Sequence, residues 1–591
     1  MPPAPTTAAE GPPLGGAASG PLWRRPSTWL WVVLLLEAIA TLVDIGAGPW
    51  SVVGFEEGRN ARAALHLACG HADRLLHLQY RDFCGGCTGV AIVGAPLLRV
   101  LGDSVATWKL VPAAFHLGLV AVSARILTRA AQPLAAIVAV GLFAASPWAL
   151  RELALTGWGN HAEVRVGVLA AAALLLSSKR PHLTAAVAGL LTGLSVWFAH
   201  IAVFAVPALL LLALRRGRSA LSFVVATPVG MLPWFAYLHA RPTAIDGARQ
   251  MWGQAHLASP TSLAHFLTGP FMPAVLWPAT HTPALDLLLA TSVVLAVLGA
   301  AAGTIATLRT RHPLGAFLML AGAGFITALV IRPDLWADVP PDPGFSAFHL
   351  RYRAVLWPLV PLGVGLLVQV RPRSGLAAAL PLLVCGLAAR GYAWTLGPGP
   401  TLHASVWSAP GRPDATVPEG TPPRRTPWAL DRPVDITAAQ AFLDSHTDPI
   451  PACRTDHAGE LGRRIGLHVR RGGSPTLPEG PSPAIAAGVA WGLHAPAGRL
   501  PERPSGHLPD SWAGPVQVAL GRHTGSCLGQ ADDAVDAATD GNRRRATTPP
   551  PTAPTGCEDD WNTLLATVSA ERGTCPLAPG WPDCGALSAS R

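Results

Sequence analysis

The chain has 591 residues, of which 50% belong to the hydrophobic set and only 13% are charged. Soluble proteins usually carry about a quarter of charged residues, so the composition excludes an ordinary soluble fold over the whole length. The net charge of +9 could indicate nucleic acid, but residues 396–591 hold 17 basic and 20 acidic groups, so the positive excess lies in the apolar part. The composition therefore predicts a membrane protein with a polar C-terminal region and no nucleic-acid partner.

The apolar part, residues 28–395, is predicted to be a polytopic α-helical domain with about eleven transmembrane helices. Residues 1–27 are rich in Pro, Ala and Gly, and we expect a disordered cytoplasmic tail there. The first apolar run, from about Trp29, is long for a signal peptide and lacks a good cleavage site. The other runs begin near Val105, Leu134, Val164, Leu183, Ile201, Ala220, Ala284, Leu314, Ala354 and Leu376.

The loops between these runs alternate in charge and length, which predicts the topology. One set is short and basic, as in Arg215-Arg216 and Arg371/Arg373, and short basic loops face the cytoplasm. The opposite set is long and holds most of the acidic residues. We therefore expect a multi-pass protein of a bacterial cytoplasmic membrane, with its N-terminus inside and residues 396–591 on the periplasmic or extracytoplasmic side.

Eight of the nine cysteines fall on that predicted outer side, in an oxidising compartment. Cys84-Gly-Gly-Cys87 has no second CxxC partner, which disfavours a metal site. A structural disulfide of this pair with Cys69, or within the pair, is the favoured interpretation. The C-terminal region reads as Pro/Gly-rich irregular structure with a few short helices and disulfide support, and we assign it no chemistry.

Glu56 and Glu57 form an acidic pair about ten residues beyond the first span, followed by Arg59 and a short amphipathic pattern over 61–69. Two adjacent carboxylates at a membrane–water boundary are either a polarised site or a solvated loop.

Several segments resemble, in order and spacing, the GT-C superfamily of membrane glycosyltransferases, and most of all its protein O-mannosyltransferase and aminoarabinose-transferase branch. The resemblance covers the layout of residues 28–395 and leaves out the C-terminal region. The family's acidic pair is usually Asp-Glu, so Glu56 stands at the Asp position and Glu57 at the Glu position. The matching segments are residues 54–70, 85–112, 157–165 and 189–214, and Arg351–Arg353.

The resemblance implies transfer of a sugar from a polyprenyl-phosphate-linked donor to an acceptor hydroxyl outside the cytoplasm, with inversion. Because a phosphate leaves without strong acid assistance, one carboxylate near the acceptor can suffice as base. Glu56 is then the base candidate, and Glu57 an orienting group or alternate base. Arg59, Arg351 and Arg353 are candidates for holding the donor phosphate, although arginines at span ends also snorkel.

Three further side chains are candidates for substrate binding. His161 and Glu163 lie at the predicted outer start of a span, where they could bind a sugar hydroxyl, bind a metal or cap a helix. His200 lies where two short spans meet. Two ligand-type residues do not define a metal site, so we assign no metal ligand, and a divalent metal is compatible with the sequence but not required by it.

Glu37 lies inside the first span, seven residues before Asp44, so both face nearly the same side of a helix. A carboxylate within a span is by default a functional hypothesis, but we favour a neutral Glu37 hydrogen-bonded between helices. Because Glu37 looks nearly alone among the spans, a permease or channel is the least favoured function. The nearer alternative to an enzyme is a catalytically inactive GT-C-like relative that serves as an envelope scaffold.

Overall fold

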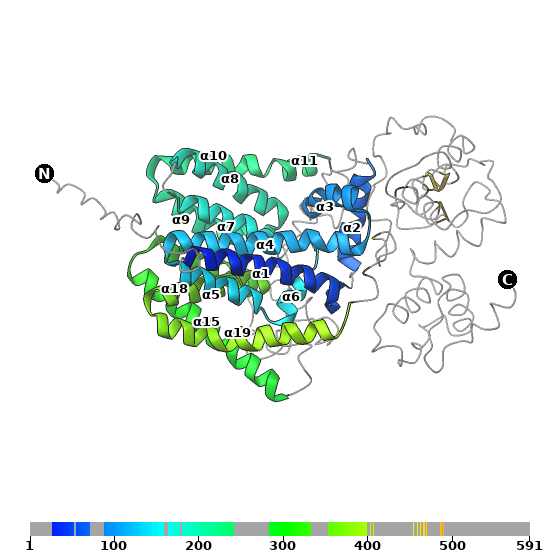
Figure 1. Cartoon of the computed structure of the whole chain (residues 1–591). Coiled ribbons are helices and arrows are strands. Elements are labelled where there is room, and N and C mark those ends of the chain that lie inside the picture. The colour runs from blue at the N-terminus through cyan, green and yellow to red at the C-terminus, as the bar shows by residue number, and fades with distance from the viewer. Residues whose placement is uncertain are drawn as a thin grey trace.

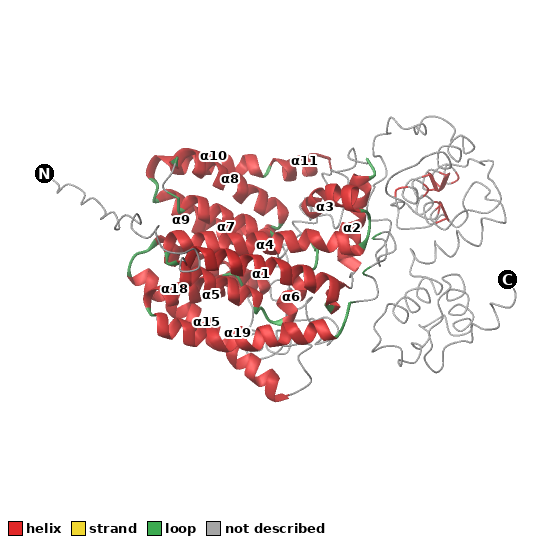
Figure 2. Cartoon of the chain, viewed as in Figure 1, coloured by secondary structure: helices red, strands yellow, loops and turns green. Residues whose placement is uncertain are grey.

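The structure is a computed structural model whose described part is built from helices (Figure 2). It describes residues 26–51, 55–70, 88–158, 163–177, 180–240, 283–331 and 353–398, and isolated positions between 402 and 489. The sequence-based expectation of an α-helical membrane protein is confirmed. The disordered tail expected over residues 1–27 and most of the C-terminal region lie outside the described residues.

The first half of the described part contains eleven helical elements, named as in Figure 1. They are α1 (Pro26–Ala47), η3 (Pro49–Ser51), α2 (Phe55–Ala68), α3 (Thr88–Leu101), α4 (Val105–Ala130), α5 (Pro133–Ala144), α6 (Trp148–Ala154), α7 (Val164–Leu175), α8 (Pro181–Phe198), η6 (His200–Ala205) and α9 (Val206–Leu214). The later elements are η7 (Gly217–Ser219), α10 (Ala220–Gly230), α11 (Leu232–Ala240), α15 (Pro283–Arg309), α16 (Pro313–Ile331), η10 (Arg353–Leu356), α18 (Leu359–Val370) and α19 (Pro372–Thr395).

Within the described residues, six helices are long and apolar enough to cross a bilayer. A seventh candidate is the pair α5 and α6, which bends by 92° and is either a broken span or a re-entrant loop. Each apolar run of the sequence coincides with a helix, but several, such as Val164–Leu175, are shorter than a full span. The expected count of eleven spans is therefore not confirmed. The six are Ser27–Ala47, Val105–Ala130, Pro181–Phe198, Gly217–His239, Leu287–Arg309 and Pro372–Thr395.

Local chemistry sets the helix boundaries at two places that matter for the site. Ser104 precedes α4, and its hydroxyl accepts a hydrogen bond from the backbone N–H of Thr107, which is an N-cap that fixes where α4 begins. Pro133 starts α5, and Pro147 separates α5 from α6. The sharp bend between α5 and α6 turns the chain back toward α4.

The helices pack side by side around one large apolar core, while α2 and α3 lie across one end of the bundle (Figure 1). Helices α8 and α10 approach each other closely, and a Cβ on Gly193 would lie 2.8 Å from the Cα of Gly230. Small residues allow such backbone approach between membrane helices. The start of α4 reaches the end of the bundle that α2 and α3 cover.

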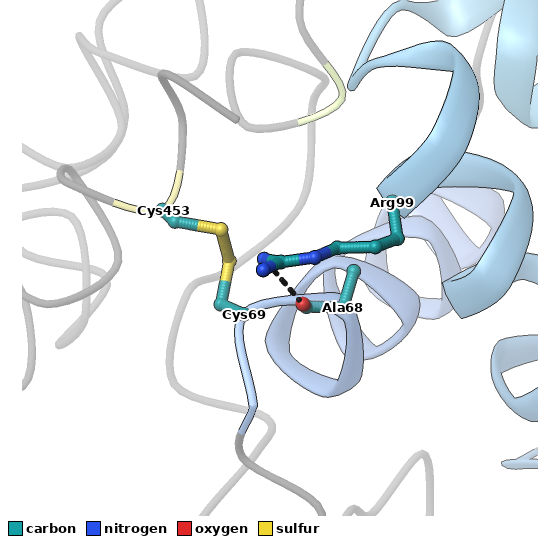
Figure 3. The surroundings of a disulfide bond; sticks show 4 residues. All are labelled: Ala68, Cys69, Arg99 and Cys453. Carbon is teal, nitrogen blue, oxygen red and sulfur yellow. Dashed lines mark hydrogen bonds between the residues drawn. A yellow bond between two sulfur atoms is a disulfide. The ribbon is translucent and has the colours of Figure 1, made fainter. Parts of the chain in front are cut away.

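The disulfide differs from the expected pairing. Cys69, directly after α2, is bonded to Cys453 of the C-terminal region, a separation of 384 residues (Figure 3). The prediction that Cys69 pairs with Cys84 or Cys87 is therefore wrong, and those two cysteines lie outside the described residues. The sequence could not supply the partner because it depends on how the chain returns to α2.

Candidate functional site

Glu57, in the first turn of α2, is fully buried and ion-paired with Lys109 of α4. The Lys109 Nζ donates to both carboxylate oxygens, at 2.9 and 2.8 Å, and to the carbonyl oxygen of Leu155 at 3.0 Å. A buried carboxylate beside a buried ammonium is compensated in charge, and breaking such a pair is strongly destabilising. This ion pair fixes the start of α2 against α4.

Two neutral donors complete the surroundings of the Glu57 carboxylate. The indole Nε1 of Trp108 and the backbone N–H of Gly157 donate to its Oε1, at 3.1 and 2.9 Å. One turn further along α2, the Asn60 Nδ2 donates to the carbonyl oxygens of Gly157 and Trp158, at 3.0 and 2.8 Å. We call Glu57, Asn60, Trp108, Lys109 and Gly157 the α2 clamp. It joins α2, α4 and the segment after α6.

The space at position 157 of the clamp is too small for a residue larger than glycine. A Cβ at this position would lie 2.7 Å from Cζ2 of Trp108, whose side chain is fully buried. Contacts this short are repulsive, so the fully buried indole would have to shift. The glycine therefore lets the backbone approach Trp108 closely enough for its N–H to reach Glu57.

The clamp unites three of the segments that carry the sequence resemblance: 54–70, 85–112 and 157–165. Two further contacts extend this set. The Arg165 Nη1 donates to the carbonyl oxygen of Ala354, in η10, at 2.7 Å. The ring of Phe198, at the end of α8, lies where a Cβ on Gly89 would collide with it. These contacts also join segments that are distant in sequence.

The other predicted site residues are described to different extents. Glu56 and Arg59 belong to α2, but their side chains lie outside the described part, as does the side chain of Arg353 at the start of η10. His161 and Arg351 lie entirely outside the described residues. Of the remaining candidates, Glu163 is buried directly before α7. His200 begins η6, and its ring lies edge-on to that of Trp234 at 5.6 Å.

Sequence reasoning missed the partners of Glu57. Lys109 is one of two lysines in the chain and interrupts an apolar stretch, so its position was a usable signal. A lysine in such a stretch needs a partner, because burying an isolated ammonium is costly. The contribution of the Gly157 N–H could not have been foreseen, because it depends on the bend between α5 and α6.

A second group of charges lies among the spans, and here the expectation for Glu37 is wrong. Glu37 forms ion pairs with Arg151 of α6 at 2.9 Å and with Arg390 of α19 at 2.6 Å, and it contacts His116 Nε2 at 2.9 Å. It is not alone among the described spans, and two of its partners are guanidinium groups. Because Glu37 is not isolated, its position no longer disfavours a permease.

Asp44 completes this group. Its Oδ2 accepts from Arg390 Nη2 at 2.6 Å, and its Oδ1 accepts from Arg390 Nε at 3.0 Å and from the indole of Trp394 at 2.8 Å. Two carboxylates face two guanidiniums, so the formal charges balance. We call Glu37, Asp44, Arg151 and Arg390 the intramembrane charge cluster. It ties the last span to the first and to the bent pair.

Within the described residues, no group of three or more His, Cys, Asp or Glu side chains could hold a metal ion.

Comparisons with known proteins give a likeness in structure alone. No protein-family model and no curated protein matches the chain. The chain is similar to the oligosaccharyltransferase of Archaeoglobus fulgidus, with 13% identity and a TM-score of 0.36 over 61% of this chain and 53% of that one. It is also similar to ArnT from Cupriavidus metallidurans, with 13% identity and a TM-score of 0.40 over 95% and 90% of the two chains.

The chain thus spans about half the length of the archaeal enzyme it matches. Both proteins belong to the GT-C superfamily, the one that the sequence segments resemble. With TM-scores below 0.5, the likeness is partial, and the function has to be argued from the residues of the site.

Proposed function

We propose that the protein is a membrane glycosyltransferase that moves a sugar from a polyprenyl-phosphate-linked donor to an acceptor hydroxyl, with inversion. The observation that supports this most is the convergence of the resembling segments on one acidic helix start: Glu57 contacts Lys109 and Gly157 directly. A solvated loop needs no buried ion pair, so the buried pair of Glu57 and Lys109 supports a built site at this helix start.

In the proposed reaction, Glu56 acts as general base. The acceptor oxygen forms a bond to the anomeric carbon of the sugar and loses its proton to the Glu56 carboxylate. The bond between that carbon and the phosphate oxygen breaks, and polyprenyl phosphate leaves with the electron pair. Attack opposite to the leaving phosphate inverts the anomeric configuration.

Glu57 has a different proposed role, that of a positioning residue. Its carboxylate is fully buried and is held in place by an ammonium, an indole and a backbone N–H. It fixes the helix backbone directly after the preceding residue, Glu56. Displacement of a reacting group by about 1 Å can cost roughly 10²-fold in rate, so rigidity at this point matters.

The remaining candidates bind substrate in this proposal. Arg59, Arg351 and Arg353 hold the donor phosphate, since guanidinium groups pair with phosphate oxygens in two-pronged geometry. The sugar hydroxyls are bound by His161, Glu163 and His200. The reaction takes place at the non-cytoplasmic face of a bacterial cytoplasmic membrane.

The test is consumption of a lipid-linked donor by the purified full-length protein. Reconstituted in vesicles with a polyprenyl-phospho-sugar and a membrane extract as acceptor source, it should release polyprenyl phosphate in stoichiometric amount with transferred sugar. If the donor stays intact while deletion of the protein still weakens the envelope, the inactive scaffold is the better reading. Uptake of solute into the vesicles with the donor intact would instead favour a permease.

A further inference from the structure

The C-terminal region contacts the end of the bundle at two places far apart in sequence. Just beyond α19, the backbone N–H of Val406 donates to the carbonyl oxygen of Asp103 at 2.8 Å, and that of Ala106 to the carbonyl oxygen of Leu402 at 3.2 Å. The chain therefore pairs with the start of α4 through its backbone. The second contact is the disulfide from Cys453.

Both contacts continue into apolar packing. Val406 and Cys453 are fully buried and belong to one cluster with residues of α2, α3 and α4, including Leu65 and Trp108. Leu402 packs into a neighbouring cluster that contains Ile45 at the end of α1. Burial of these side chains against the helices indicates a fitted surface, because a tether held by the disulfide alone would not exclude water around Val406.

We propose that the end of the bundle formed by α2, α3 and the start of α4 is the docking surface of the chain's own C-terminal region, and that the Cys69–Cys453 disulfide latches α2 in its working position. The part of this proposal that concerns sugar transfer rests on the proposed function. The part that concerns docking and the position of α2 is independent of it.

The reason lies in how α2 is held at its two ends. The start of α2 is fixed by the ion pair of Glu57 with Lys109. The end of α2, at Ala68 and Cys69, has two partners (Figure 3). The Arg99 Nη1, from α3, donates to the carbonyl oxygen of Ala68 at 3.3 Å, and Cys453 is bonded to the next residue. Cys69 lies 12 positions after Glu57, which corresponds to about 18 Å along a helix.

A helix of this length is only marginally stable by itself, so its last turns depend on what they pack against. When the latch is absent, we expect the end of α2 to fray and the helix to rock about the clamp. The acidic start of α2 then loses its fixed orientation.

The latch forms by oxidation of two thiols. A thiol–disulfide oxidoreductase of the extracytoplasmic compartment accepts two electrons and two protons from Cys69 and Cys453, and its own disulfide becomes a dithiol. The bond forms only after residue 453 has crossed the membrane and docked, so it also reports that the C-terminal region has reached α2.

The first measurement is disulfide mapping on the wild-type protein. Membranes are treated with an alkylating agent before solubilisation, and the non-reduced peptides are identified by mass spectrometry. We expect a cross-linked peptide that joins Cys69 to Cys453. A Cys69 that is alkylated, or joined to Cys84 or Cys87, would overturn the proposal, and this result does not depend on any variant folding.

The second measurement compares C69S/C453S with C385A. Cys385 is a buried cysteine in the middle of α19 and a free thiol, so its replacement is the matched control. In the double variant we expect severalfold faster hydrogen exchange in the last turn of α2 and a lower kcat for sugar transfer, with insertion retained. C385A should match the wild type in both.

Failure of the two proposals can be told apart. Unchanged exchange in α2 and an unchanged transfer rate in C69S/C453S would overturn the latch while the glycosyltransferase stands. A wild-type protein that transfers no sugar, but has the Cys69–Cys453 cross-link and slower hydrogen exchange in α2 than C69S/C453S, would support the docking surface. It would refute the glycosyltransferase function.

Discussion

Replacing Lys109 with Met tests the α2 clamp at its charged centre. Met has nearly the length of Lys and fills the same space between α2 and α4, but it supplies neither the charge nor the hydrogen bonds. Glu57 would keep its contacts to Trp108 and Gly157 and lose the ammonium from both oxygens. A fully buried carboxylate would then lack a counter-charge.

The geometry sets the size of the effect. Lys109 and Glu57 are 1% and 0% exposed and their charged atoms lie 2.8 Å apart, so solvent does not screen the pair. Removing one partner of a buried ion pair typically costs about 3–5 kcal/mol, whereas replacing both partners by uncharged groups is often close to neutral. We therefore expect K109M to destabilise by about that amount and E57Q/K109M to recover most of it.

The assay is denaturant unfolding in detergent, followed by tryptophan fluorescence, for the wild type, K109M, E57Q and the double variant. The double-mutant cycle gives the coupling between the two side chains. Arg309→Gln is the control, because Arg309 is exposed at the end of α15. A loss below about 1 kcal/mol in K109M, in the range of an exposed ion pair, would refute the clamp as a buried pair.

Two further variants and one reporter fusion test the charge cluster, the α2 clamp and the topology. Arg390→Gln should destabilise by about 3–5 kcal/mol, because Asp44 and Glu37 lose their shared guanidinium; an unfolding midpoint equal to that of Arg309→Gln would contradict this. Gly157→Ala should cost about 1–3 kcal/mol, since its Cβ would press on Trp108, and unchanged unfolding would show that the indole can move. A reporter active only outside the cytoplasm, fused after residue 398, should be active; an inactive fusion that is stably inserted would place the C-terminal region in the cytoplasm.

Sequence hydropathy located most of the apolar helices, because hydropathy over about 20 residues is a local property that the bilayer imposes. It missed α3 (Thr88–Leu101), which falls in a segment expected to be an outer loop. It did not determine how many cross the membrane. The bend between α5 and α6 depends on Pro147 and on Ser146, whose hydroxyl accepts from the Trp357 indole of a distant segment. Such breaks depend on contacts that no window of the sequence contains.

The pairing of charges was the least predictable part. Glu37 is 114 positions from Arg151 and 353 from Arg390, and the disulfide joins residues 384 apart. Partners at such separations are set by the arrangement of whole helices. The useful signal was chemical: a charge inside an apolar run requires an opposite charge nearby, and Arg390 was the available one in the last span.

Glu56→Gln tests the proposal that the start of α2 carries the catalytic base. The amide retains the size of the carboxylate but cannot accept a proton at neutral pH. We therefore expect the rate of sugar transfer from the lipid donor to fall by about 10²–10⁴-fold. The unfolding midpoint should stay at the wild-type value, in contrast to Glu57→Gln, which loses the charge paired with Lys109 and should unfold earlier. Glu152→Gln, a half-buried acid in α6, is the matched control and should retain full activity. A Glu56→Gln protein that inserts normally and transfers sugar at the wild-type rate would show that Glu56 is not the base.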